Sequence, residues 1–300
     1  MWVSLAFLSA LMLGLYDVAK KRSLKENAVL PVLWLNTLFS TIIFLPALLD
    51  SAVGGGWLDN TLFETTSGTL RDHAIIVVKA AMVLSSWIFG YFGLKHLPLT
   101  LVGPINATRP VLVLVGATLI FGEQLNAYQW AGVLTTILSI FMMSRAGKKE
   151  NIDFKSNKWI WCVAGATIMG AVSGLYDKFV MRQLSPMFVQ SWFNLYQMLI
   201  MIVICALLWY PTRHKTTPFR WSWAIPLISI FICLADFAYY TSLSDPDSMI
   251  SVVSLVRRSS VIISFLCAAI IFRERNLRAK ALDLVLILLG MALIRLGTAR

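Results

Sequence analysis

The chain alternates long apolar runs with short polar connections over its whole length. Ten of the runs reach the ~20 residues that an α-helix needs to cross a bilayer. They cover residues 2–20, 29–49, 73–95, 98–121, 126–144, 158–181, 186–210, 221–243, 248–272 and 279–296. Only α-helices satisfy their own backbone hydrogen bonds in lipid, and these runs are too long and too uniformly apolar for barrel strands. The pattern therefore predicts an all-α integral membrane protein with ten transmembrane helices.

The order of polar residues within the runs repeats once along the chain. The sequence Gly14-Leu15-Tyr16-Asp17 recurs as Gly174-Leu175-Tyr176-Asp177, and further matches follow in the same order. These matches are Trp34 and Asn36 with Trp192 and Asn194, Tyr91 with Tyr240, Phe121-Gly122-Glu123 with Phe272-Arg273-Glu274, and Ser139 with Gly290. The order predicts two five-helix halves, residues 1–146 and 158–300, joined by a basic loop at 147–157. Because five is odd, the second half enters the membrane from the opposite side, an inverted repeat typical of secondary transporters.

Composition excludes a soluble globule. Of the 300 residues, 58% are hydrophobic and 14% charged, and the mean hydropathy is +0.74. The net charge of +11 gathers in short connections, where it orients helices in a bilayer and does not indicate a nucleic-acid partner. The four cysteines lie in apolar runs without close spacing, and no glycine-rich phosphate loop or catalytic triad is present. We expect no cofactor, no metal site and no enzymatic activity.

Eight charged residues remain inside the runs after the loop charges are set aside. They are Asp17, Lys79, Arg109, Asp177, Asp236, Arg257, Arg258 and Asp283. Each would cost about 2.5–3.5 kcal/mol at a helix centre facing lipid, so each should face a cavity or a partner.

The three arginines fall near the middle of the fourth and ninth runs. Arg109 lies between Pro104 and Pro110, which can bend a helix, and Arg257 and Arg258 occupy the matching region. Guanidinium groups bind carboxylate and phosphate bidentately, so the arginines indicate an anion site near the midplane. Neighbouring helix residues point about 100° apart, so only one of the adjacent pair can face the cavity directly, and alignment with Arg109 favours Arg258. The alternative is that the arginines only pair with aspartates.

Asp17, Asp177, Asp236 and Lys79 are candidates for coupling or gating. The inversion places Asp17 and Asp177 at opposite membrane faces, where they could exchange protons or gate by pairing with arginine. Alternatively, each pairs with a basic neighbour such as Lys20. Asp236 and Lys79 could pair with each other across the centre of the molecule.

Neutral substrate contacts are expected from Asn36 and Asn194, which occupy matching positions, and from Tyr240, one turn after Asp236. The alternative for the two amides is that they bond neighbouring helices.

The two five-helix halves, the glycine within the first helix and the Phe-x-Glu after the fourth resemble the EamA-type family of the drug/metabolite transporter superfamily. The resemblance covers essentially the whole chain. It implies transport of amino acids, nucleotide sugars, sugar phosphates or drugs, with helices one, three and four of each half, and part of helix two, lining a central cavity. Arg273 departs from the family pattern where the first half has Gly122, and the family does not require the charged residues above.

These features predict a multi-pass secondary transporter of the cell (inner) membrane that moves a small polar metabolite by alternating access. The expected substrate is an amino acid, organic acid or phosphate ester, with a coupled proton or counter-substrate, and the protein is expected to be a monomer or homodimer. The alternatives are a multidrug or lipophilic-cation exporter, or a membrane-embedded enzyme. Loop charge places both termini outside the cell, whereas the family resemblance implies cytoplasmic termini, so the orientation stays open.

Overall fold

Every regular element in the described part of the chain is a helix. The computed structural model describes residues 2–58, 61, 63–109, 111–113, 126–148, 152, 154, 156–181, 183–244, 253, 256–272 and 277–298. Its α-helices are α1 (Trp2–Ser23), α2 (Val29–Val53), α3 (Leu70–His96), α4 (Leu99–Ala107), α6 (Ala127–Lys148), α7 (Lys158–Val180), α8 (Pro186–Ile204), α9 (Ala224–Ser244), α11 (Ser260–Ile271) and α12 (Leu277–Thr298). A π-helical turn, η1 (Cys205–Trp209), and a 3-10 turn, η2 (Tyr210–Thr212), continue α8. The all-helical prediction is confirmed for these residues.

Each predicted apolar run overlaps one of these described α-helices. Parts of the fourth and ninth runs lie outside the described residues, as do Pro110, Glu123 and Glu274. Five described helices are long and apolar enough to cross a membrane by length and composition alone: Val29–Val53, Leu70–His96, Lys158–Asp177, Pro186–Thr212 and Ala224–Ser242.

The outer surface suits a lipid environment. On α6, Leu134, Ile137 and Leu138 are all more than half exposed. Exposed apolar side chains at this density are uncommon on soluble proteins but are expected where lipid tails replace water. The molecule therefore has the surface of a membrane protein.

Local signals in the sequence fix several helix ends. The Thr69 hydroxyl accepts a hydrogen bond from the Asp72 amide, while the Asp72 carboxylate accepts one from the Thr69 amide, which caps the start of α3. At the end of α2, Gly54 adopts a φ of 65°, a left-handed conformation that glycine reaches without steric penalty. These caps end α2 and start α3 on either side of the connection at 54–69.

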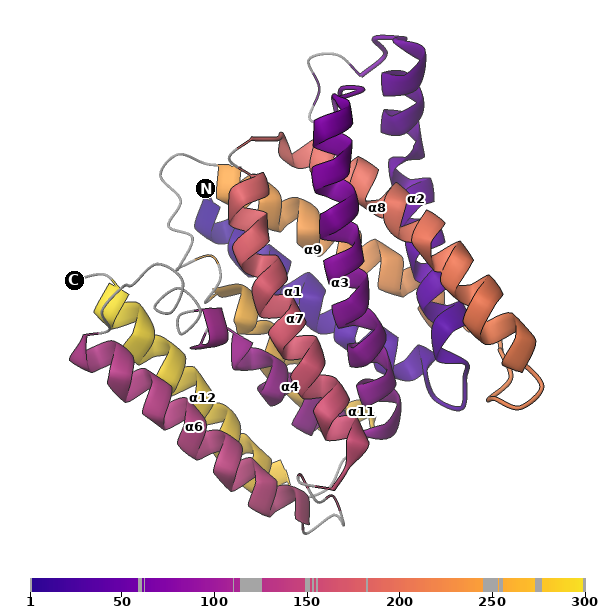
Figure 1. Ribbon diagram of the computed structural model, residues 1–300. Helices are drawn as coiled ribbons and strands as arrows, with labels where there is room; N and C mark the ends of the chain where they lie inside the picture. The colour runs from indigo at the N-terminus through magenta and orange to yellow at the C-terminus, as the bar shows by residue number, and fades with distance from the viewer. Residues whose placement is uncertain are drawn as a thin grey trace.

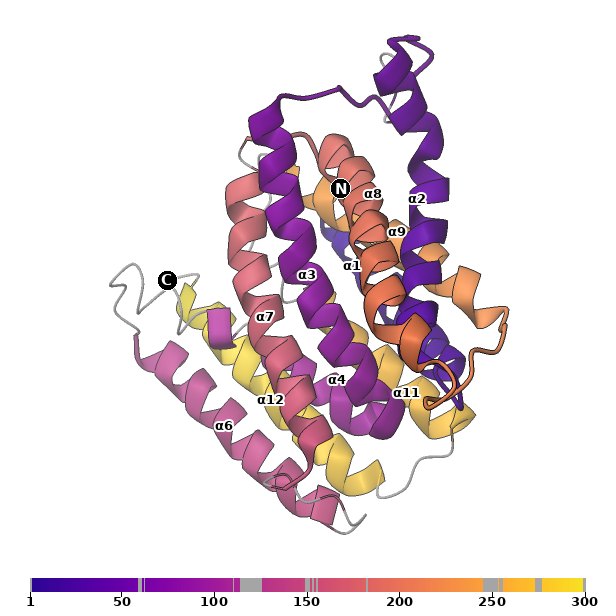
Figure 2. The same ribbon diagram turned by 45° about the vertical axis from the view of Figure 1, so that its right-hand side comes forward.

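The helices pack mainly across the two sequence halves. The largest contacts join α1 with α9, α3 with α7, α2 with α8, and α6 with α12. Figures 1 and 2 show α6 and α12 side by side as one pair, next to the remaining helices. Smaller contacts join α1 with α11, α4 with α7, α2 with α9, α3 with α8, and α4 with α11.

One continuous hydrophobic cluster holds most of this bundle together. It includes the fully buried Leu33 of α2, Leu101 of α4, Ile228 of α9 and Ile287 of α12. The charged residues of the interior lie beside this cluster and around a cavity.

Candidate functional site

A cavity of about 180 Å³ lies inside the bundle. Its wall is formed by α1, α3, α4, α7 and α9, by residues just before and within α11, and by Phe193 of α8. Seven of the eight charged residues predicted within the spans line it: Asp17, Lys79, Arg109, Asp177, Asp236, Arg257 and Arg258. Tyr240 also lines it, whereas Asp283 is buried elsewhere, on α12. The structure thus brings residues from distant parts of the sequence to one polar chamber.

Asp17 pairs within its own helix. The Lys20 ammonium lies 2.9 Å from an Asp17 carboxylate oxygen, and the Ser264 hydroxyl of α11 donates to the other oxygen over 3.3 Å. The same ammonium lies 4.3 Å from the ring centroid of Tyr16 and 5.2 Å from that of Tyr91. For Asp17, pairing with a basic neighbour is therefore the arrangement found.

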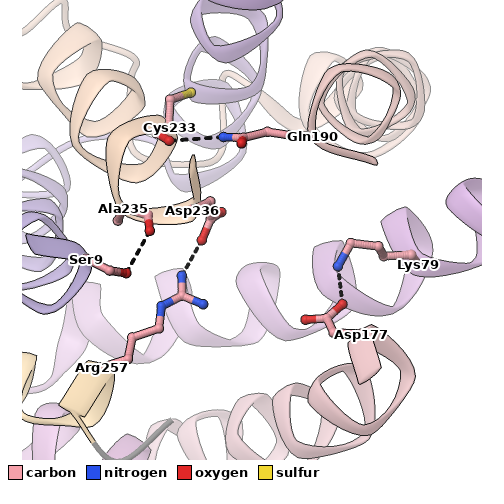
Figure 3. A network of polar contacts seen from close by, with 8 residues as sticks. All are labelled: Ser9, Lys79, Asp177, Gln190, Cys233, Ala235, Asp236 and Arg257. Carbon is pink, nitrogen blue, oxygen red and sulfur yellow. Dashed lines mark hydrogen bonds and ion pairs between the residues drawn. The ribbon is translucent and has the colours of Figure 1, made fainter. Parts of the chain in front are cut away.

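Asp177, in contrast, pairs across the sequence halves. Its carboxylate binds the Lys79 ammonium of α3, and the Lys79 side chain is almost fully buried, with 1% exposed (Figure 3). The ammonium also lies 4.9 Å from the Phe193 ring centroid and 5.4 Å from the Tyr240 ring centroid. The suggested pairing of Lys79 with Asp236 is wrong, because α3 packs along α7 and brings Lys79 to Asp177 instead.

Asp236 of α9 pairs with Arg257. The guanidinium donates to the Asp236 carboxylate (Figure 3). Its central carbon lies 4.0 Å from the ring centroid of Tyr239. This pair stays within the second half of the chain. Of the two adjacent arginines, Arg257 is therefore held by a carboxylate.

Arg109 and Arg258 have no such carboxylate partner within the part of the chain that the structure describes. Neither forms an ion pair with any carboxylate among the described residues, although both line the cavity. The Nε atom of Arg109 is buried and makes no hydrogen bond within the described part of the chain. The positive charges of Arg109 and Arg257 both act on the guanidinium of Arg258. Two guanidinium groups are thus left available to a ligand.

Each of these two arginines lies at a tight turn. The Thr108 amide bonds the Ile105 carbonyl, and the Ser259 amide bonds the Val256 carbonyl, both three residues back. Each hydroxyl donates to that same carbonyl, over 2.7 Å for Thr108 and 2.6 Å for Ser259. Arg109 directly follows the first turn, whereas Arg258 lies within the second, just before Ser259. Helix interruptions near the midplane are where transporters expose backbone and side chains to substrate.

The glycines of the repeated Gly-Leu-Tyr-Asp motif differ in their surroundings. A Cβ atom at Gly14 would lie 2.7 Å from the Ile263 Cβ atom, so this glycine permits close packing of α1 on α11. A Cβ atom at Gly174 would meet nothing within 4 Å, so this position borders open space in the cavity wall. The glycine of the first copy thus allows close helix packing, whereas the glycine of the second copy borders open space.

The structure brings neither Asn36 nor Asn194 to the cavity wall. The Asn36 side-chain carbonyl accepts a hydrogen bond from Ser229 over 3.1 Å, and the Asn194 amide donates to the Gln190 carbonyl over 2.9 Å. These residues belong to a polar seam where α2, α8 and α9 meet, with Gln197 beside them on α8. The Asn36 side chain therefore bonds the neighbouring helix α9, whereas the Asn194 side chain bonds the backbone of its own helix.

Charges in the cavity wall do not balance. The described lining residues include five cations, Lys20, Lys79, Arg109, Arg257 and Arg258, and three carboxylates. Three ion pairs use three of the cations, which leaves an excess of two positive charges. No group of three or more His, Cys, Asp or Glu side chains among the described residues is placed to hold a metal ion.

A family model described as the EamA-like transporter family matches residues 1–145 and 157–296. The chain belongs to the EamA-like transporter family. This membership confirms the resemblance drawn from the residues, and the family consists of membrane transporters.

Two curated relatives of this EamA-like chain are similar over shorter stretches. An "Uncharacterized transporter" of Archaeoglobus fulgidus is 23% identical over 133 residues, 44% of each chain. A "Probable 4-amino-4-deoxy-L-arabinose-phosphoundecaprenol flippase subunit ArnE" of Yersinia pseudotuberculosis is 36% identical over 76 residues, 25% of this chain and 64% of the relative. The matched part is thus less than two thirds of either relative. One solved crystal structure shares the fold, with a TM-score of 0.65 at 16% identity, over 98% of this chain and 97% of its own.

Sequence reasoning overlooked Gly170 of this EamA-like protein. A Cβ atom at Gly170 would overlap the guanidinium group of Arg109, so the bare α7 backbone provides the space that Arg109 occupies. Gly170 lies one turn before the repeated Gly174 on the same helix face, and this spacing was the only signal available.

Proposed function

We propose that the protein is a secondary transporter of a small anionic metabolite that works by alternating access between two inverted five-helix halves. The observation that carries the proposal is the cavity in which one unpaired arginine from each half, Arg109 and Arg258, faces the same space. The two would bind the anion, while Asp17, Asp177, Asp236 and Lys79 would gate or couple transport. The cell (inner) membrane is the proposed location.

Helix packing supports the two-half arrangement. If the two halves are repeats, α7, α8, α9, α11 and α12 correspond to α1, α2, α3, α4 and α6. Each contact between the halves should then have an equivalent contact. The α1–α9 contact is matched by α7–α3, the α1–α11 contact by α7–α4, and the α2–α9 contact by α8–α3. The α2–α8, α4–α11 and α6–α12 contacts map onto themselves. This is the pattern expected around a pseudo-two-fold axis, on which inverted-repeat transporters place their substrate.

Electrostatics favours an anion over a cation. A lipophilic cation in this chamber would meet two uncompensated guanidinium groups in a medium of low dielectric constant, where like charges repel strongly. This argues against the alternative of a cation exporter. The substrate named for the Yersinia relative contains a phosphate, which fits the same charge preference.

Transport by purified protein in liposomes tests the proposal. The panel of labelled probes would contain inorganic phosphate, glycerol 3-phosphate, succinate, lactate, alanine and tetraphenylphosphonium. We expect uptake of at least one anion that is lost in Arg109→Gln and Arg258→Gln, while a Trp161→Phe control on the exposed face of α7 retains it. Arginine-independent uptake of tetraphenylphosphonium alone would contradict the proposal.

A further inference from the structure

The charges of the cavity wall indicate how many negative charges the substrate carries, and not only that it is an anion. Lys20, Lys79 and Arg257 each face a carboxylate, so their charges are offset before any ligand arrives. Arg109 and Arg258 are the remaining cations of the described wall, and both keep full positive charge at neutral pH. An occupant that leaves no net charge in the chamber must therefore carry two negative charges.

Placement of the two arginines favours one compact group over two separate ones. Arg109 directly follows the turn at Thr108, Arg258 lies within the turn at Ser259, and both side chains line the same cavity. A guanidinium group presents a planar fork of donors that matches two oxygens of a phosphate. A dianionic phosphate has three such oxygens and can accept from both forks at once.

We propose, building on the proposed function, that the cavity is selective for a phosphate monoester in its dianionic form, held jointly by Arg109 and Arg258. Monocarboxylates would leave one guanidinium unpaired in the chamber. A zwitterionic amino acid would leave both charges of the wall uncompensated. Leaving an ion unpaired away from water is strongly unfavourable, so selection by charge follows from the wall itself.

The net charge of the wall depends on which cations form ion pairs. If Asp236 were absent, Arg257 would join the unpaired set and the excess would rise by one. If Arg109 or Arg258 were absent, the excess would fall to one and match a monoanion. The charge that the wild-type cavity prefers is therefore set by the number of wall cations without a carboxylate partner, and not by the total number of cations.

The pH dependence of binding provides the first test. Affinity of the purified full-length protein for glycerol 3-phosphate would be measured by calorimetry from pH 5 to pH 7.5. The second ionisation of a phosphate monoester has a pKa of about 6, so we expect affinity to rise about tenfold over this range. Sulfate, which is dianionic throughout, should show no such rise. A flat profile for glycerol 3-phosphate, with affinity equal to that at pH 7.5, would overturn the proposal.

Charge-altered variants provide the second test. In Arg109→Gln and in Arg258→Gln, we expect the preference for glycerol 3-phosphate over lactate to fall at least tenfold, with no larger drop in thermal midpoint than in Trp161→Phe. Wild-type binding of lactate, alanine or succinate as tight as that of glycerol 3-phosphate would overturn the phosphate assignment but leave an anion transporter. If no anion in the transport panel showed arginine-dependent uptake, the proposed function itself would fail, which separates the two outcomes.

Discussion

Gly170 of α7 lies directly against the guanidinium group of Arg109. Because any side chain at this position would occupy the space of that group, Gly170 sets where the first unpaired arginine can point. Gly174, one turn further along α7, has open space in place of a neighbour. The two glycines therefore form a matched pair for testing how much the position of Arg109 matters.

We expect Gly170→Ala to weaken anion binding about tenfold or more. Displacing Arg109 should remove at least one charge-assisted hydrogen bond, which contributes about 1.5–3 kcal/mol, and each 1.4 kcal/mol is a factor of ten in affinity. Gly174→Ala should leave affinity within a factor of two. The measurement is a binding isotherm for glycerol 3-phosphate and a KM for uptake.

The same substitution in an Arg109→Gln background separates positioning from general damage. If Gly170 acts through Arg109, Gly170→Ala should change affinity no further once the arginine is gone. An equal loss in both backgrounds would mean that Gly170 supports the helix and not the arginine.

The Lys79–Asp177 ion pair should be the most important charged contact for stability. Lys79 is almost fully buried, so Asp177→Asn leaves an unpaired ammonium in the interior, and breaking such pairs costs about 3–5 kcal/mol. Asp17→Asn removes a partner of Lys20 on the same helix, where the carboxylate is 22% exposed, and should cost under about 1 kcal/mol. Thermal midpoints in detergent compare the two variants.

Exchanging the two charges provides the control for this pair. The double variant Lys79→Asp with Asp177→Lys should recover part of the stability lost in Asp177→Asn, because an ion pair can form again. Equal midpoints for Asp177→Asn and Asp17→Asn would show that the pair linking α3 and α7 is not stronger than the one within α1.

The order of apolar and polar residues was sufficient to predict the all-helical class, the approximate positions of the described helices and which charged residues lie in the interior. Those features depend on local composition, since a charge in lipid is unfavourable whatever its neighbours. Which charges meet depends on helix packing. Asp17 and Asp177 occupy the same motif, yet one pairs with Lys20 in its own helix and the other with Lys79 of α3.

The asparagines illustrate the limit of matching positions between halves. Asn36 and Asn194 correspond in sequence, and both lie in the seam of α2, α8 and α9, away from the cavity. Helical periodicity states which residues share a face but not which neighbour that face contacts. The role of Gly170 could not be predicted for the same reason, because it depends on contact with Arg109, which lies on another segment of the chain.

Arg257 and Arg258 should respond differently to the same substitution. Arg257→Gln leaves the Asp236 carboxylate without its ion-pair partner, so we expect a lowered thermal midpoint as well as weaker transport. Arg258→Gln removes a cation that the charges of Arg109 and Arg257 repel, so the midpoint should stay the same or rise while anion uptake is lost. Paired measurements of midpoint and uptake separate the two roles, and a large drop in midpoint for Arg258→Gln would count against a binding role.

Gln197 on α8 offers a test of the polar seam. Its side chain is fully buried, and neither amide atom has a hydrogen-bond partner among the described residues. Replacing such a group by an apolar side chain of similar size is nearly neutral or stabilising, so Gln197→Leu should leave or raise the thermal midpoint. Asn36→Leu should give a lower midpoint than Gln197→Leu, because it removes one of the two acceptors of the Ser229 hydroxyl and leaves only the Asn36 backbone carbonyl. A lowered midpoint for Gln197→Leu would indicate that ordered water satisfies the amide.

The excess positive charge of the cavity should slow the conformational change of the protein without bound substrate. Under the proposed alternating access, the two halves would close around Arg109 and Arg258 without an anion, and burying an unpaired ion costs several kcal/mol. With an anion bound, that cost is largely offset. We therefore expect uptake into proteoliposomes preloaded with unlabelled glycerol 3-phosphate to start at least tenfold faster than uptake into empty ones. In Arg109→Gln, which leaves a single unpaired arginine, the acceleration should shrink together with the rate. Equal initial rates into loaded and empty wild-type vesicles would show that the empty carrier returns freely, and that the charge of its wall is offset by some other group.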